Sequence, residues 1–136
     1  MPDPRLSILI VDDSKIIRDL LSDYLREMGH RVDLAVDGQE GIEKALAGEF
    51  EVVFCDLHMP RRNGYQVFRE VSRAKPNITF IMTDSLPDQL AVTAAAAGAC
   101  YCLTKPFDLD QVCRTLDSVL AEGKTPCPKP STKTSR

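Results

Sequence analysis

The chain alternates between short runs that are almost entirely apolar and longer stretches in which apolar residues recur every three or four positions. The short runs are LSILIV (6–11), RVDLAV (31–36), EVVFC (51–55), ITFIM (78–82) and ACYCL (99–103). Runs of this length and composition predict β-strands. Most of them are apolar at consecutive positions, which indicates a parallel sheet covered on both faces.

The longer stretches predict one amphipathic helix after each strand, over residues 14–29, 37–49, 64–74, 87–98 and 108–123. Ser14 is expected to cap the first helix and Gly29 to end it. Pro87 suits the first turn of the fourth helix, and Asp108 suits the cap of the last. Strands that alternate with helices predict βαβ units and a doubly wound α/β fold. Right-handed crossovers leave few strand orders for such a sheet.

A chain of 136 residues favours a single domain, which we expect over residues 1–123. Residues 124–136 are rich in proline and polar residues and are expected to form a disordered tail or the start of a linker. The net charge of −3 and the lack of a basic stripe argue against nucleic-acid binding. No apolar run is long enough for a membrane span or a signal peptide, so we expect a cytoplasmic protein.

The five cysteines include no CxxC pair, and we interpret them as buried, inert thiols. Polar side chains instead gather where the expected strands end. Asp12 and Asp13 follow the first strand, Asp56 the third and Thr83 the fourth, while Lys105 lies just past the fifth. Asp56 has no basic neighbour in the sequence for several residues, and we expect it to lack a side-chain partner.

In a sheet of order 2-1-3-4-5 the first and third strands are neighbours, so the three carboxylates lie together at the carboxyl edge. Two carboxylates about 4 Å apart repel by roughly 4 kcal/mol at an effective dielectric constant of about 20. Either the acids are protonated or a cation lies among them. An all-oxygen site with few protein ligands suits Mg²⁺, which keeps several of its waters.

The segments ILIVDDS, VVFCDLHMP followed two residues later by NG, FIMT, and LTKPF occur in this order. Together they resemble the response-regulator receiver domain of two-component signalling, over roughly residues 5 to 121. The resemblance implies a flavodoxin-like (βα)5 three-layer sandwich with the parallel strand order 2-1-3-4-5. It also implies a protein that catalyses only its own phosphorylation and dephosphorylation and is otherwise not an enzyme.

By this resemblance Asp56 is the phospho-acceptor and receives a phosphoryl group from a sensor histidine kinase or a phosphotransfer protein. Asp13, Asp56 and the backbone carbonyl of His58 would bind Mg²⁺, with Mn²⁺ as an alternative, and Asp12 would hold a metal-bound water. The implied assembly is a monomer or a weak, phosphorylation-dependent dimer that switches contacts with a downstream protein.

By the same resemblance, Thr83 and Lys105 would each bind an oxygen of the phosphoryl group. The resemblance also implies a cis peptide bond between Lys105 and Pro106. Ile17 is either part of a broad core stripe or an exposed contact for the kinase. His58 is expected at the rim of the site, where only its carbonyl suits the metal.

Three positions depart from the family pattern. Cys102 stands where the family has a switching aromatic ring, and the neighbouring Tyr101 must face the other side of the sheet because strand side chains alternate. Asp84 replaces a small residue and is expected either to disfavour the phosphoryl group or to point to solvent. Arg62 stands where an apolar residue is common.

Cys102 and Asp84 keep a rival function open, namely a receiver-like module that binds partners without phosphorylation, although the intact set of acids argues against it. The chain could also be the receiver part of a larger regulator with a DNA-binding or enzymatic effector domain. A phosphatase of the dehalogenase type needs a second acid two residues after the nucleophile, where this chain has His58. A nucleotide-binding role lacks the glycine-rich motifs GxxxxGK and GxGxxG.

Overall fold

The structure is a computed structural model that describes residues 6–84, 101–105 and 107–121. In chain order, the elements in this part are β1 (Ser7–Val11), α1 (Lys15–Glu27), β2 (Arg31–Ala35), α2 (Gly38–Ala47), β3 (Val52–Asp56), α3 (Gly64–Ala74), β4 (Thr79–Asp84), β5 (Tyr101–Thr104) and α5 (Leu109–Ala121). The expected helix over 87–98, the Lys105–Pro106 peptide bond and the expected tail over 124–136 lie outside the described residues.

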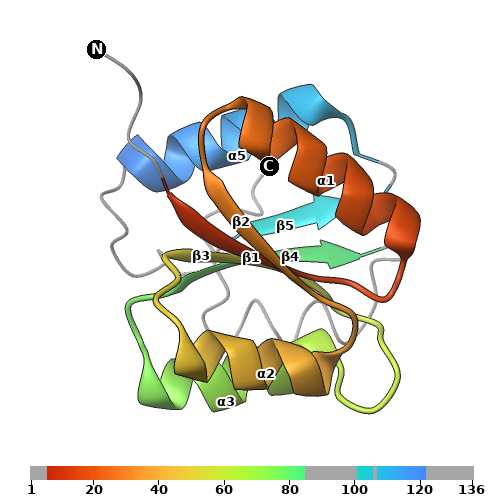
Figure 1. Cartoon of the computed structure of the whole chain (residues 1–136), viewed down its shortest axis with the longest axis vertical. Helices are drawn as coiled ribbons and strands as arrows, with labels where there is room; N and C mark the ends of the chain where they lie inside the picture. Colours follow the sequence, from red (N-terminus) through yellow and green to blue (C-terminus); the bar gives the residue numbers. More distant parts are fainter. Residues whose placement is uncertain (1–5, 85–100, 106, 122–136) are drawn as a thin grey trace, which may run out of the picture.

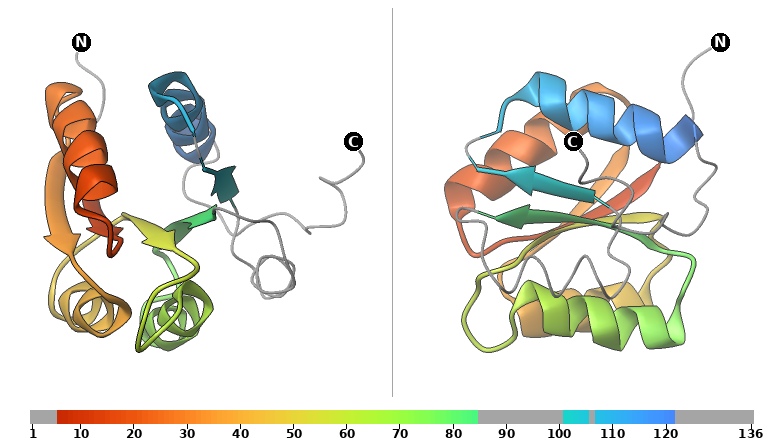
Figure 2. Two further views of the ribbon diagram at one scale, coloured as in Figure 1. Left: turned by 90° about the vertical axis from the view of Figure 1, so that its right-hand side faces the viewer. Right: turned by 180° about the vertical axis from the view of Figure 1, so that it is seen from behind.

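The five strands form one parallel sheet in the order β2-β1-β3-β4-β5. Helices α1 and α5 cover one face of the sheet, and α2 and α3 cover the other (Figures 1 and 2). The α/β fold, its three layers and its strand order are therefore confirmed. Because every strand runs in the same direction, the ends of β1, β3, β4 and β5 come together at one edge.

The predicted helix boundaries follow from local hydrogen bonds. The Ser14 hydroxyl accepts a hydrogen bond from the backbone N–H of Ile17 at 3.4 Å, as expected of an N-cap. Gly29, just past α1, has a φ of +98°, a left-handed conformation that favours glycine. Asp108 accepts from the Gln111 backbone N–H at 2.8 Å, and the Gln111 side chain accepts from the Asp108 N–H at 2.9 Å. This reciprocal pair is a capping box at the start of α5.

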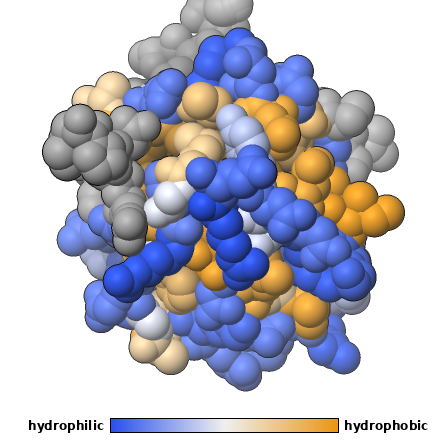
Figure 3. Space-filling model, turned by 45° about the horizontal axis from the view of Figure 1, so that its top comes forward, coloured by the Kyte–Doolittle hydropathy of each residue, from blue (hydrophilic) through white to orange (hydrophobic). Residues whose placement is uncertain are grey.

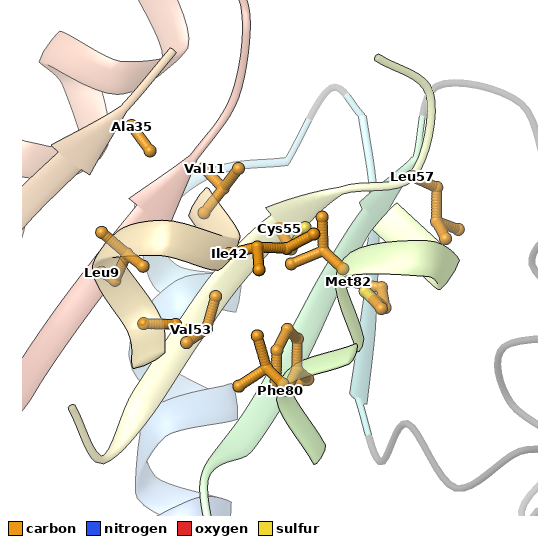
Figure 4. Packing of buried hydrophobic residues seen from close by; sticks show 12 residues of the cluster. Leu9, Val11, Ala35, Ile42, Val53, Cys55, Leu57, Phe80 and Met82 are labelled. Carbon is orange, nitrogen blue, oxygen red and sulfur yellow. The ribbon is translucent and has the colours of Figure 1, made fainter. Parts of the chain in front are cut away.

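Apolar side chains form a core on each face of the sheet. Figure 4 shows the core beneath α2 and α3, where Val53, Cys55, Phe80 and Met82 of the central strands meet Ile42 of α2. Phe54 and Ile81, one position further along their strands, point to the opposite core beneath α1 and α5. β3 and β4 are buried along their whole length, so the continuous apolar runs predicted their two-sided cover correctly.

Of the three cysteines that the structure describes, one contradicts the interpretation as buried thiols; Cys100 and Cys127 lie outside the described residues. Cys55, Cys102 and Cys113 are all free; Cys55 is buried and Cys113 half-buried, but Cys102 is exposed. Burial, followed by the negative charges of Asp56 and Asp12, raises the pKa of the Cys55 thiol well above its ordinary value, which makes it unreactive.

Candidate functional site

The predicted site residues come together at the carboxyl edge of the sheet. Asp12 and Asp13 follow β1, Asp56 is the last residue of β3, and Thr83 lies beside Asp56 in the β3–β4 register. Lys105 directly follows β5. The sheet therefore joins residues that are up to 93 positions apart in the sequence.

The three acids form one cluster. A carboxylate oxygen from each of Asp12, Asp13 and Asp56 lies within 4.8 Å of the other two. Asp12 and Asp56 are buried, with exposed fractions of 2% and 5%, whereas Asp13 is exposed. The Asp12 side chain is held by the backbone N–H of Ser14 at 2.9 Å.

Lys105 contacts both buried acids. Its Nζ atom lies 3.1 Å from Asp12 Oδ2 and 3.4 Å from Asp56 Oδ2. The expectation that Asp56 lacks a side-chain partner is therefore wrong, because Lys105, distant in sequence, is brought to it by β5. One ammonium still leaves the three-acid cluster with a net negative charge.

The electrostatics of the cluster favour a proton or a cation on the acids. Burial and the neighbouring Asp12 raise the pKa of Asp56 from 3.8 to about 6, although Lys105 and the His58 backbone N–H oppose the shift. Burial alone would lower the pKa of the Lys105 ammonium, but Asp12 and Asp56 raise it above its ordinary value. Three carboxylates of this kind fit a hard divalent cation such as Mg²⁺.

The Thr83 hydroxyl completes the immediate surroundings of Asp56. Thr83 is 2% exposed, and its Oγ1 atom has no hydrogen-bond partner within the part of the chain that the structure describes. A buried hydroxyl without a partner is costly unless an incoming group provides one. The position beside Asp56 suits a hydroxyl that donates to a group carried by that carboxylate.

Two supporting residues were not identified from the sequence. The Arg18 guanidinium donates a hydrogen bond of 2.7 Å to the backbone carbonyl of Asp12 and so holds the loop that carries two acids. Gly64 lies so close to the end of β3 that an added Cβ atom would be 2.5 Å from the Asp56 carbonyl oxygen. The sequence gives no signal for Arg18, while Gly64 stands out in it only as part of the NG pair that follows VVFCDLHMP.

The positions that depart from the family pattern have clear places in the structure. Tyr101 packs against the core beneath α1 and α5, and Cys102 points the other way, so the predicted alternation holds. Asp84 is 1% exposed, which rules out the second of its two alternatives, that it points to solvent. Its Oδ1 atom lies 3.3 Å from Nε2 of His58 at the rim of the site. Arg62 pairs with Glu70 at 3.3 Å on the surface.

The surface of α1 favours the core-stripe alternative for Ile17 over the exposed kinase contact. Ile17 is only half-buried and packs against the core beneath α1 and α5, as a broad core stripe requires. Ile16 and Leu20 are the large apolar residues that α1 exposes, at 78% and 42%. Figure 3 shows hydrophobic side chains interspersed among hydrophilic ones on the side where α1 and α5 lie.

The comparisons with known proteins agree with this geometry. Residues 8–117 match the family model of the response regulator receiver domain. The chain therefore belongs to the response regulator receiver domain family, the CheY-like receivers of two-component systems. Such a receiver is a signalling module and not an enzyme. Of the described residues, none forms a helix long and apolar enough to cross a membrane.

Among its relatives, the chain is 34% identical over 125 residues to the transcriptional regulatory protein ZraR of Klebsiella oxytoca, covering 91% of this chain and 28% of that protein. It thus spans about a quarter of the length of that relative. It is 32% identical over 114 residues to the chemotaxis protein CheY of Thermotoga maritima, covering 82% of this chain and 95% of that protein.

A solved structure with a bound metal and phosphoryl analogue is also similar to this chain. The response regulator TrrA of Thermotoga maritima, in complex with Mg²⁺-BeF, is similar with a TM-score of 0.77 and 28% identity. The alignment covers 84% of this chain and 98% of that one.

Proposed function

We propose that this chain is a phosphorylatable receiver in which Asp56 accepts a phosphoryl group from a phosphohistidine on a sensor kinase or a phosphotransfer protein. A carboxylate oxygen of Asp56 attacks phosphorus, the N–P bond of the phosphohistidine breaks, and the released imidazole nitrogen takes a proton. The supporting observation is that the Asp56 carboxylate lies 3.4 Å from the Lys105 ammonium and that Asp56 pairs in the sheet register with Thr83, whose hydroxyl is buried. Phosphoryl transfer requires positioning and charge neutralisation of this kind.

The acids would hold a divalent metal ion, Mg²⁺ or alternatively Mn²⁺. Asp13 and Asp56 suit direct ligands, together with the backbone carbonyl of His58, and Asp12 suits a metal-bound water. When bound, the metal would neutralise charge on the acids and on the phosphoryl oxygens. The similar structure of TrrA, in complex with Mg²⁺-BeF, supports a magnesium site in this chain.

Lys105 and Thr83 would bind two further oxygens of the transferred group. Lys105 already lies between Asp12 and Asp56, so it can exchange a carboxylate contact for a phosphoryl oxygen without a large movement. The Thr83 hydroxyl would gain the partner that it lacks among the described residues. Each of these contacts is a charge-assisted hydrogen bond, which is stronger than a neutral one.

Residues 1–123 would form the receiver and residues 124–136 a tail or linker. A receiver meets its kinase in the cytoplasm, and we place this chain there, without nucleic-acid binding by the domain itself. The output would be altered contacts with a downstream protein. ZraR is a transcriptional regulatory protein several times longer than the matched segment, which makes a larger regulator one form in which this domain could act.

A second candidate function is partner binding without phosphorylation. The observation that favours it is the exposed Cys102 in place of an aromatic ring. A receiver of that kind would bind its partner equally well with or without a phosphodonor.

Intact-mass spectrometry after incubation with acetyl phosphate and Mg²⁺ tests the proposal. The wild-type chain should gain the mass of one phosphoryl group, and Asp56→Asn should gain none. Asp23→Asn, an exposed acid on α1, is the matched control and should be labelled like the wild type. Equal labelling of Asp56→Asn and the wild type would show that Asp56 is not the acceptor.

A further inference from the structure

Asp84 is an acid buried next to the site. It ends β4, and its backbone carbonyl accepts a hydrogen bond of 2.7 Å from the Lys105 N–H, so the sheet fixes its position. Its side chain is 2% exposed and contacts Nε2 of His58 at 3.3 Å, whereas the His58 side chain is 46% exposed. The imidazole therefore bridges from the surface to a buried carboxylate.

The loop that carries His58 joins β3 to α3, and backbone hydrogen bonds to residues outside the loop interior hold its two ends. The Leu57 N–H donates to the Thr83 carbonyl at 2.9 Å, and the Gly64 N–H donates to the Leu57 carbonyl at 2.9 Å. Between these ends, the His58 N–H donates a long hydrogen bond of 3.3 Å to Asp56 Oδ1, and the Arg62 N–H donates to the Pro60 carbonyl at 2.8 Å. Side chains also tie the loop to its neighbours on both sides. His58 reaches Asp84 on β4, and Arg61 reaches Asp37 at the start of α2 at 2.7 Å.

We propose that the His58–Asp84 pair fixes the backbone of His58 so that its carbonyl faces the three-acid cluster. His58 and Asp84 would then be positioning residues for the divalent metal. The inference rests on the proposed function, which assigns that carbonyl to the metal. It gives the acid at position 84 a role that the family pattern, with a small residue there, does not supply.

The difference in burial between the two ties explains why this pair should matter. Arg61 is 71% exposed, and an ion pair in that setting holds a loop weakly because water competes for both partners. Asp84 is shielded from water, so its contact with the imidazole persists in a defined geometry. The imidazole of this pair also belongs to the same residue as the proposed ligand carbonyl.

A rival explanation is that Asp84 acts only through its charge, which attracts a cation from a distance. The two explanations predict opposite results for His58→Ala. This variant keeps the backbone carbonyl and removes only the imidazole. If Asp84 acts through its charge alone, the loss of a side chain that can carry positive charge would leave the Mg²⁺ affinity unchanged or increase it. If the pair positions the His58 carbonyl, the Mg²⁺ affinity of His58→Ala falls.

The experiment measures Mg²⁺ binding by isothermal titration calorimetry for the wild type, His58→Ala, Asp84→Ala and the double variant, with Arg61→Gln as the control on the same loop. Each single variant should bind Mg²⁺ about 10-fold more weakly, the low end of the range of about 10- to 100-fold for partners that orient metal ligands, because the imidazole acts on its carbonyl only through the backbone. The double variant should bind like the singles, because the pair is already lost in each. Arg61→Gln should bind like the wild type.

Hydrogen exchange of the metal-free chain gives a second reading. The amides of Leu57 and Gly64 should exchange faster in His58→Ala than in the wild type, and not faster in Arg61→Gln. Circular dichroism establishes that each variant is folded. If Asp84→Ala does not fold, the comparison of His58→Ala with Arg61→Gln decides, because the exposed imidazole can be removed without emptying the core.

The inference is overturned if His58→Ala binds Mg²⁺ as tightly as the wild type, if the two single effects multiply, or if the wild type binds no Mg²⁺. Its failure is distinct from that of the proposed function. A wild-type chain that binds Mg²⁺ but takes up no phosphoryl group would contradict Asp56 as acceptor, and the binding and exchange measurements would still test the role of the pair.

Discussion

The buried carboxylate of Asp56 should make the metal-free protein less stable as the pH rises. The folded chain raises the pKa of this acid from 3.8 to about 6, first through burial and then through the charge of Asp12. The folded state therefore holds the proton more tightly than the unfolded state. The resulting stabilisation is fully present below the ordinary pKa and is lost as the pH rises through the pKa of the folded state.

The size of the effect follows from the shift. A difference of about two pKa units corresponds to about 3 kcal/mol of folding free energy. The Asp56 side chain is 7% exposed, so solvent screening reduces this figure little. A loss of this size is a large part of the total stability of a typical domain, which is about 5–15 kcal/mol.

The assay is urea unfolding, followed by circular dichroism, of the wild type and Asp56→Asn in the presence of a chelator. Other carboxyl groups titrate in both proteins, so the difference between the two isolates Asp56. Relative to the variant, the wild type should lose about 3 kcal/mol between about pH 4 and about pH 7. A difference that stays constant over this range would refute the reasoning.

Added Mg²⁺ should restore the stability of the wild type at neutral pH. A ligand that binds only the folded state stabilises it by about 1.4 kcal/mol at tenfold its dissociation constant. The gain should be small for Asp56→Asn, because that variant lacks one of the proposed ligands. An equal gain in both proteins would contradict the assignment of Asp56 to the metal.

Two further predictions concern residues around the acceptor. Asp13→Asn should be as stable as the wild type or more stable in chelator, because it relieves repulsion from Asp12 and Asp56, and it should lose the thermal stabilisation by millimolar Mg²⁺; a large drop in its metal-free melting temperature would instead make Asp13 structural. Gly64→Ala should lose about 1–3 kcal/mol in urea unfolding, because the added methyl group meets backbone atoms that cannot move aside; unchanged stability would mean that the loop adjusts freely.

The pattern of the sequence was sufficient to predict the sheet and the meeting of the site residues. The strands predicted from the apolar runs were correct because β3 and β4 are buried on both faces, and strands buried in this way consist almost entirely of apolar residues. Asp12, Asp56 and Thr83 could be placed together because parallel strands end at one edge. These features depend on strand position alone.

What the sequence could not supply was side-chain direction beyond the strands. The contact of Lys105 with Asp56 depends on where the chain goes after β5, and the contact of His58 with Asp84 depends on the path of a loop. Cys102 looked buried because it lies in an apolar run, but β5 is an edge strand in which Cys102 and Thr104, on one face, are exposed. Periodicity carries no information about such contacts, since they arise from tertiary structure.

The position of Lys105 also has a consequence for folding. The cation of the site is provided from the end of a four-residue edge strand that pairs with β4 alone. Its contact with Asp12 closes a loop of 93 residues, and contacts that distant in the chain carry a large entropic cost of closure. A nascent chain that has formed β1, β3 and β4 therefore has its acids in place without their ammonium. The site should be able to accept a phosphoryl group only after β5 has joined the sheet. Any opening of that edge strand would remove the Lys105 ammonium from the acids before the rest of the domain unfolds.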